Sequence, residues 1–101
     1  MLRMLAICLC FTSTAKACET ALLLSIDISG SIDEGEYAIQ IEGLALALQD
    51  PAIIDSLVGG KMALAVVHWS GVGRQALVLP WQRMLARADV THFSQTVATQ
   101  K

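Results

Sequence analysis

Three oxygen-bearing side chains follow an apolar run near the start of the chain. Asp27, Ser29 and Ser31 stand two residues apart in the segment DISGS. In extended or gently curved backbone, side chains at this spacing point to the same side. One carboxylate and two hydroxyls are hard oxygen ligands, which suit Mg²⁺, Mn²⁺ or Ca²⁺ better than zinc. The pattern therefore predicts part of a divalent-cation site.

The segments on either side of these residues would hold them in place. Ala21 to Ile26 is an apolar run of strand length without polar alternation, which is typical of a strand buried on both faces of a parallel sheet. Asp33 with Glu36, and Ser31 with Glu34, both have the spacing of a capping box, so a helix is expected to begin here. Ligands of open α/β sheets gather at the carboxyl ends of the strands, where the three residues would lie.

The rest of the chain predicts further helices and strands in alternation. The first helix is expected to end at Gln49, and a short helix capped by Asp50 should run from Pro51 to Val58. A strand from Met62 to Trp69, a turn from Ser70 to Arg74 and a strand from Gln75 to Leu79, halted by Pro80, are expected next. The last expected element is a helix that begins at Asp89 and runs to the end of the sequence. The short turn allows only a hairpin, so these two strands should form an antiparallel pair at a sheet edge. The predicted class is α/β.

In this setting, the motif Asp27-Ile28-Ser29-Gly30-Ser31 resembles the D-x-S-x-S element of the metal-ion-dependent adhesion site in von Willebrand factor type A domains. The segments ALLLSIDISGSIDEGEYAIQIEGLALAL and VVHWSGVGRQALVLPW also look like a bacterial exported family of unknown function that carries this domain. The resemblance covers Cys18 to about Met84. It implies the first half of a doubly wound, Rossmann-like sheet with an antiparallel edge hairpin, with residues 18–101 as the N-terminal portion of the domain.

The resemblance also implies a function. Asp27, Ser29 and Ser31 would hold Mg²⁺, or Mn²⁺ or Ca²⁺, and an Asp or Glu carboxylate of a protein partner would complete the shell. The family completes its site with a Thr and an Asp from two later loops, whereas the last threonines here fall in the predicted final helix. Whether this incomplete site retains the ion is left open. Because the first strand is central in the family, its outer edge is expected to lack a partner here.

Two other interpretations of the same residues remain open. The chain can be a truncated copy without activity of its own, or a metal-assisted hydrolase in which the ion activates water. A hydrolase needs a base, and the nearby Glu34 and Glu36 are explained more simply by the start of the helix. We therefore favour a binding module over an enzyme.

For several further residues, a structural role explains the sequence better than a catalytic or ligand-binding role does. Gly71, Gly73 and Ala76 approximate a dinucleotide-binding fingerprint, but a strand rather than the required helix should follow them. His68 lies in an apolar run and is expected in the core, while His92 should face solvent. The two tryptophans, Trp69 and Trp81, are expected to cover the core end of the hairpin.

Residues 1–17 have the features of a secretory signal peptide. A basic Arg3 precedes an apolar run from Met4 to Phe11, and small residues flank Lys16 at the end. The apolar run is far shorter than the roughly 20 residues that span a bilayer. We therefore predict export, to the periplasm or the medium, without a transmembrane segment. Cys18 would become the first residue, as a lipid-anchor site, a free thiol or a half-cystine whose partner lies outside this sequence.

Composition narrows the class of protein further. Of the 101 residues, 54 % are hydrophobic and 16 % charged, which is too apolar for a disordered segment. Loss of Arg3 and Lys16 with the signal peptide would move the formal net charge from −2 to −4. No basic patch for nucleic acid or anionic lipid is visible. The 84 remaining residues suit one domain at most.

Overall fold

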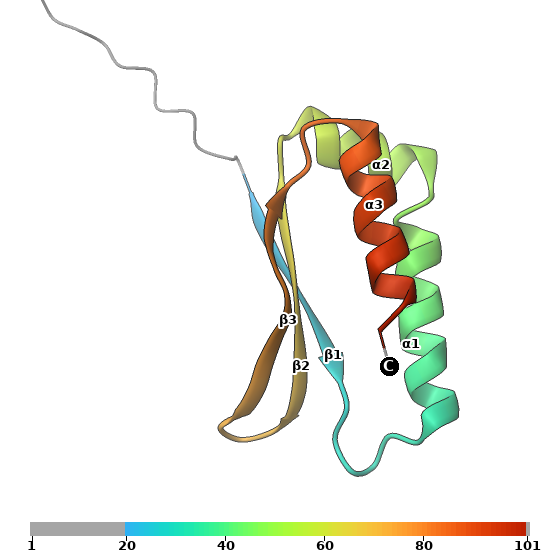
Figure 1. Ribbon diagram of the computed structural model, residues 1–101, viewed down its shortest axis with the longest axis vertical. Coiled ribbons are helices and arrows are strands. Elements are labelled where there is room, and N and C mark those ends of the chain that lie inside the picture. Colours follow the sequence, from blue (N-terminus) through green and yellow to red (C-terminus); the bar gives the residue numbers. More distant parts are fainter. Residues whose placement is uncertain (1–19, 101) are drawn as a thin grey trace, which may run out of the picture.

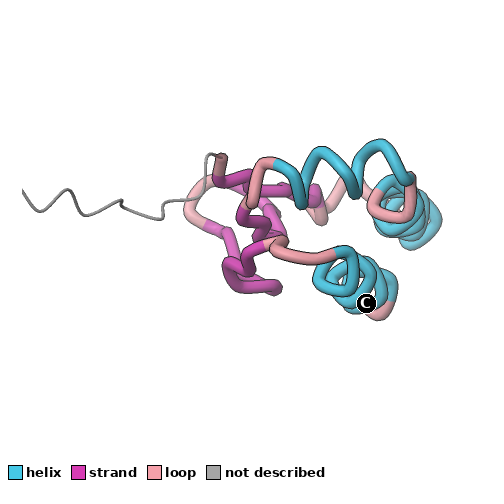
Figure 2. The backbone as a smooth tube through the Cα atoms, turned by 90° about the horizontal axis from the view of Figure 1, so that it is seen from above, coloured by secondary structure: helices cyan, strands magenta, loops and turns pink. Residues whose placement is uncertain are grey.

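A three-stranded sheet carries helices against one of its faces (Figures 1 and 2). The computed structural model describes residues 20–100, so the predicted signal peptide and Cys18 lie outside the described residues. The elements are β1 (Ala21–Asp27), α1 (Glu34–Ala47), α2 (Pro51–Gly59), β2 (Ala63–Gly71), β3 (Arg74–Arg83) and α3 (Arg87–Ala98). Their order and type confirm the predicted α/β class.

The strands lie in the order β1-β2-β3. β1 and β2 are parallel and are connected through α1 and α2, as a parallel pair requires. β2 and β3 form the predicted antiparallel hairpin. Gly73 in its turn has a φ of 73°, which favours a residue without a side chain. The arrangement is consistent with part of a Rossmann-like α/β fold.

β3 continues past Pro80 to Arg83, so the prediction that Pro80 halts this strand was wrong. The cross-strand pairs on either side of Pro80 are Val66 with Leu79 and Leu64 with Gln82. Between these pairs β3 has one residue more than β2, which makes a β-bulge. Proline is tolerated at a bulge on an outer strand because no ladder hydrogen bond there needs its missing N–H.

One of the two predicted capping boxes starts α1. The Asp33 carboxylate accepts a hydrogen bond from the Glu36 N–H at 2.8 Å, and the Glu36 carboxylate accepts one from the Asp33 N–H at 2.9 Å. The alternative box of Ser31 and Glu34 is not formed. Asp50 caps α2 as predicted, with Pro51 at the first helical position. Since Asp33 caps α1, the Ser31 hydroxyl is left for contacts within the preceding loop.

All four carbonyls in the last turn of α1 accept hydrogen bonds. Three accept from the backbone N–H groups of residues 48–50. The fourth, the Ala45 carbonyl, accepts from the buried Ser94 hydroxyl of α3 at 2.8 Å. Helix ends normally leave such carbonyls without intrahelical partners, so Ser94 both satisfies α1 and ties it to α3.

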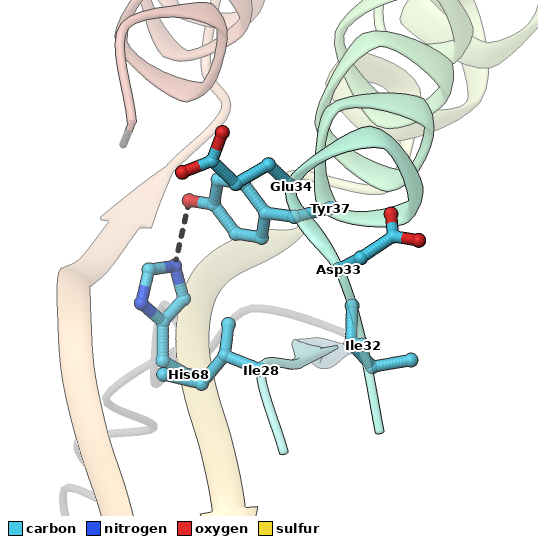
Figure 3. Close-up of a pocket in the computed structure, with 6 residues that line it drawn as sticks. All are labelled: Ile28, Ile32, Asp33, Glu34, Tyr37 and His68. Atoms are coloured by element: carbon cyan, nitrogen blue, oxygen red, sulfur yellow. Dashed lines mark hydrogen bonds between the residues drawn. The ribbon is translucent and has the colours of Figure 1, made fainter. Parts of the chain in front are cut away.

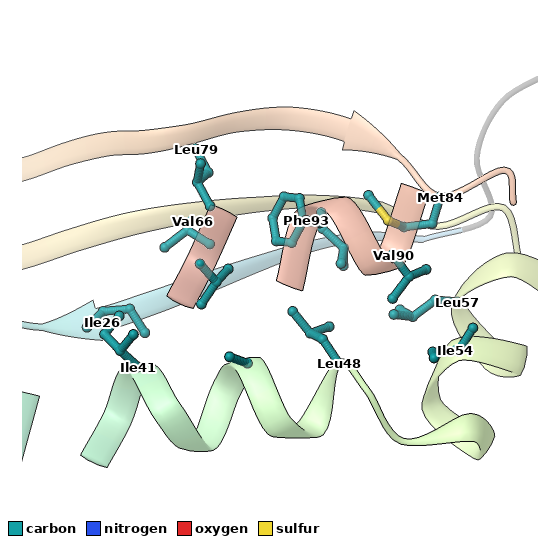
Figure 4. Packing of buried hydrophobic residues seen from close by; sticks show 13 residues of the cluster. Ile26, Ile41, Leu48, Ile54, Leu57, Val66, Leu79, Met84, Val90 and Phe93 are labelled. Atoms are coloured by element: carbon teal, nitrogen blue, oxygen red, sulfur yellow. The ribbon is translucent and has the colours of Figure 1, made fainter. Parts of the chain in front are cut away.

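The core lies between the sheet and the helices (Figure 4). Its most buried large side chains are Phe93, Leu64, Met84, Val66, Val90 and Val97. One face of α1 points into this layer, with Ile41 and, at the end of the helix, Leu48 buried. α3 begins at Arg87 and ends at Ala98, rather than beginning at Asp89 and running to the end of the sequence. Asp89 instead accepts hydrogen bonds from the backbone N–H groups just before the helix.

β1 is not buried on both faces, contrary to the prediction. Ile26 is its one buried residue, and Leu23 is 49 % exposed. The strand is one of the two outer strands of the described sheet, and the helices of residues 20–100 cover one face only (Figure 2). Within the described residues no strand pairs with its outer edge.

Candidate functional site

The loop that carries the predicted ligands joins the end of β1 to the start of α1. The Ile28 N–H donates to the Trp69 carbonyl at 2.8 Å, which extends the pairing with β2 by one residue. The Ile32 N–H then donates to the Ser29 carbonyl at 2.9 Å and closes a turn. With the Asp33 cap at its far end, this short loop is held by hydrogen bonds at both ends.

The three predicted site residues lie together in this loop. The Ser29 N–H donates to Asp27 Oδ1 at 2.8 Å, and the hydroxyl oxygens of Ser29 and Ser31 are 3.2 Å apart. The two hydroxyls therefore lie next to each other, and Ser29 links them to the Asp27 carboxylate. One oxygen of that carboxylate is occupied by the Ser29 N–H.

Gln40 of α1 also positions this site, although the sequence analysis missed it. Its side-chain amide donates to the Asp27 carbonyl at 2.9 Å, and its side-chain oxygen lies 3.3 Å from the Asp27 N–H, which donates to it. This two-way contact fixes the backbone that carries the carboxylate. The available signal was its position three residues after Tyr37, which puts a polar side chain on the inward face of α1.

The electrostatics of the loop keep Asp27 ionised. The pKa of Asp27 lies below its ordinary value of 3.8, because the Ser29 hydroxyl and, second, the Ser29 backbone N–H stabilise the carboxylate. Desolvation acts weakly in the opposite direction. At neutral pH the three residues Asp27, Ser29 and Ser31 therefore present one full negative charge beside two neutral hydroxyls.

We expect Ser29→Ala to raise the pKa of Asp27 toward its ordinary value without reaching it, because the hydroxyl is lost and the backbone N–H stays. A ¹³C NMR titration of the Asp27 carboxyl in metal-free buffer measures this, with Ser31→Ala as the control. Since folding lowers the pKa of Asp27, the ionised carboxylate stabilises the folded state. This stabilisation is present above the pKa that Asp27 has in the unfolded chain, and it is lost as the pH falls through the lower pKa that Asp27 has in the folded chain. An unchanged Asp27 titration in Ser29→Ala would mean that the hydroxyl does not act on the carboxylate.

A small pocket adjoins the same loop, which contributes Ile28 and Ile32 to its lining (Figure 3). Its volume is about 270 Å³, and its lining residues are Ile28, Ile32, Asp33, Glu34, Tyr37 and His68. The Tyr37 hydroxyl is 3.4 Å from His68 Nε2, and the two rings meet edge to face with their centroids 5.8 Å apart. Burial raises the pKa of Tyr37. The pocket thus pairs apolar walls with a polar aromatic contact.

The environments of His68 and Trp81 differ from those predicted. His68 is only half-buried: it lies in the second half of β2, lines the pocket and contacts Tyr37 in the first turn of α1. Trp81 is 50 % exposed rather than covering the core end of the hairpin, and it lies in the bulged part of β3. His92 is exposed and the segment after Gly73 is a strand, both as predicted.

Residues 20–100 contain no group of three His, Cys, Asp or Glu side chains that could hold a metal ion. The set of Asp27, Ser29 and Ser31 contains a single carboxylate and two hydroxyls, so it does not belong to this type of cluster. None of the described helices has the length and apolar character needed to cross a membrane.

Comparison with known protein families gives a match that spans the whole described chain. A family described as "Protein of unknown function (DUF1194)" matches residues 17–101. The matched range includes every described helix and strand and the whole loop from Asp27 to Asp33. No curated protein and no solved structure matches the chain.

Proposed function

Because the chain belongs to this family of proteins of unknown function, we propose its function from the site: an exported module that binds a protein partner through a divalent cation. Asp27, Ser29 and Ser31 would hold the ion, and an Asp or Glu side chain of the partner would complete its shell. The observation that carries the proposal is the gathering of both hydroxyls beside the ionised Asp27 carboxylate.

The spacing of the two hydroxyl oxygens is compatible with ligands of one divalent ion. Two neighbouring ligands of octahedral Mg²⁺ lie about 3 Å apart, because each metal–oxygen bond is about 2.1 Å long. The hydroxyl oxygens of Ser29 and Ser31 are 3.2 Å apart. Ca²⁺ has longer bonds but also more ligands, so its neighbouring oxygens lie at a similar separation. The set is therefore compatible with Mg²⁺ and with Ca²⁺, and Mn²⁺ is a suitable probe for it.

The charge of the set supports a partner with a carboxylate. A divalent ion bound by one carboxylate and two neutral hydroxyls retains a net positive charge. Three protein ligands also leave about half of an octahedral shell to water or to a partner. A partner's Asp or Glu would bring both a hard oxygen and the compensating charge.

A relation to von Willebrand factor type A domains is part of this proposal. It is supported by the position of the D-x-S-x-S loop directly after a first parallel strand and before a capped helix.

Export remains a prediction from Met1 to Ala17, which lie outside the described residues. Binding is favoured over hydrolysis because the Glu36 carboxylate, one of the two nearby bases, is bonded to the backbone in the capping box.

Titration of the full chain with Mn²⁺ tests the proposal. Paramagnetic broadening of amide signals in ¹H–¹⁵N spectra should appear first at Ser29, Gly30 and Ser31, and EDTA should reverse it. Signals of α2, such as Ile54, serve as the internal control. Broadening that is spread evenly over exposed carboxylates, or none at this loop, would contradict a cation site at Asp27, Ser29 and Ser31.

A further inference from the structure

We propose that the pocket formed by Ile28, Ile32, Asp33, Glu34, Tyr37 and His68 binds an arginine side chain of a protein partner. Its volume of about 270 Å³ is below the roughly 300–1,000 Å³ of sites for drug-sized ligands. It therefore suits one long side chain better than a cofactor or a whole small molecule. The pocket shares the loop with the proposed cation site, but none of its lining residues is a proposed ligand of the ion.

The walls of the pocket match the stem and the plane of an arginine. Ile28 and Ile32 supply aliphatic surface from the loop, and the Tyr37 ring faces the cavity from α1 (Figure 3). Arginine buries its methylene stem along apolar surface while its guanidinium stays near polar groups. The planar guanidinium also stacks on aromatic rings, which a lysine ammonium does less well.

The charge of the pocket favours a cation. Glu34 lines it, and no basic side chain among residues 20–100 forms a salt bridge with Glu34. α1 contains three glutamates and no lysine or arginine. The amino end of a helix carries about half a positive charge, which would attract an anion. Here the carboxylates of Asp33 and Glu36 already bond to the amides of that end.

Glu34 is therefore the carboxylate left to meet a ligand. The Asp33 carboxylate accepts the Glu36 N–H as the helix cap and points away from the Tyr37 ring in Figure 3. Glu34 makes no hydrogen bond to the described residues, and in Figure 3 its carboxylate is directed toward the side of the pocket where the Tyr37 hydroxyl lies. A guanidinium over the Tyr37 ring could donate to this carboxylate.

The test is an NMR titration of the full chain with the peptide acetyl-Ala-Ala-Arg-Ala-Ala-amide, in buffer that contains EDTA. The matched peptide has citrulline in place of arginine, which keeps the shape and removes the charge. We expect shifts at Ile28, Ile32 and Tyr37 with the arginine peptide and much smaller shifts with the citrulline peptide. EDTA makes the result independent of the proposed cation site, so either proposal can fail alone.

Two variants assign the contact. Glu34→Gln should weaken binding of the arginine peptide severalfold, whereas Glu42→Gln, the same charge change two turns along α1, should not. Tyr37→Leu keeps an apolar side chain and should weaken binding roughly twofold to fivefold through loss of the cation–π contact. Equal binding of the arginine and citrulline peptides, or no effect of Glu34→Gln in a protein that is still folded by circular dichroism, would overturn the proposal.

Discussion

Replacing Asp27 by asparagine is expected to abolish detectable binding of Mg²⁺ and Mn²⁺ by this chain. Asparagine keeps the size of the side chain and an oxygen that can accept the Ser29 N–H, so the loop should keep its shape. What is lost is the only negative charge of the proposed ligand set. Changes to residues that merely orient a ligand cost about 10- to 100-fold in metal affinity. Loss of the charged ligand itself should cost at least about 100-fold.

Thermal unfolding with and without MgCl₂ measures the effect. An ion at ten times its dissociation constant stabilises the folded state by about 1.4 kcal/mol, which corresponds to roughly 6–11 °C in melting temperature for a domain of this size. The wild-type chain should show this rise, and Asp27→Asn should show none. Glu42→Gln, an exposed acid on α1, is the control for general charge effects. A full rise in Asp27→Asn would place the ion elsewhere.

Phe93→Ala is expected to destabilise the fold by about 3–5 kcal/mol, because it deletes the largest fully buried side chain and leaves a cavity. Phe93 is 2 % exposed and lies between the strands and α1 (Figure 4). Small domains have total stabilities of about 5–15 kcal/mol, so this single change removes much of the available stability.

Urea unfolding followed by circular dichroism checks this value. Leu46→Ala is the matched control, because Leu46 is 65 % exposed on α1 and its truncation should change stability by no more than about 0.5 kcal/mol. If Phe93→Ala does not fold at all, Phe93→Leu, which deletes less volume, should give a smaller and measurable loss. Equal stabilities of Phe93→Ala and Leu46→Ala would mean that the core is not packed around α3.

The order of the elements was predictable because the signals that define them are local. Asp33 and Glu36 bond within one turn of helix, and Asp50 with Pro51 starts α2 in the same way. The hairpin follows from a turn too short for any crossover. The D-x-S-x-S spacing likewise placed Asp27, Ser29 and Ser31 in one loop, where the Ser29 N–H bonds the Asp27 carboxylate and the two hydroxyls are 3.2 Å apart. Cation binding by these residues stays a prediction.

The features that were missed or wrong depend on partners that are distant in sequence. Pro80 stays within β3 because its strand is an outer one with a bulge, which the residues around it do not reveal. The exposure of β1 depends on which sheet face the helices cover. An apolar run indicates a strand, but it does not indicate how many of its faces are covered.

The candidate site divides in the same way. The sequence by itself determined which oxygen-bearing side chains the loop offers, because Asp27, Ser29 and Ser31 lie within five residues and need only a turn to meet. Only the tertiary structure decided that Gln40, 13 residues away, holds the Asp27 backbone, and that Tyr37 meets His68 across 31 residues. The physical reason is that such contacts form when α1 packs on the sheet, and its packing depends on the whole core rather than on any local pattern.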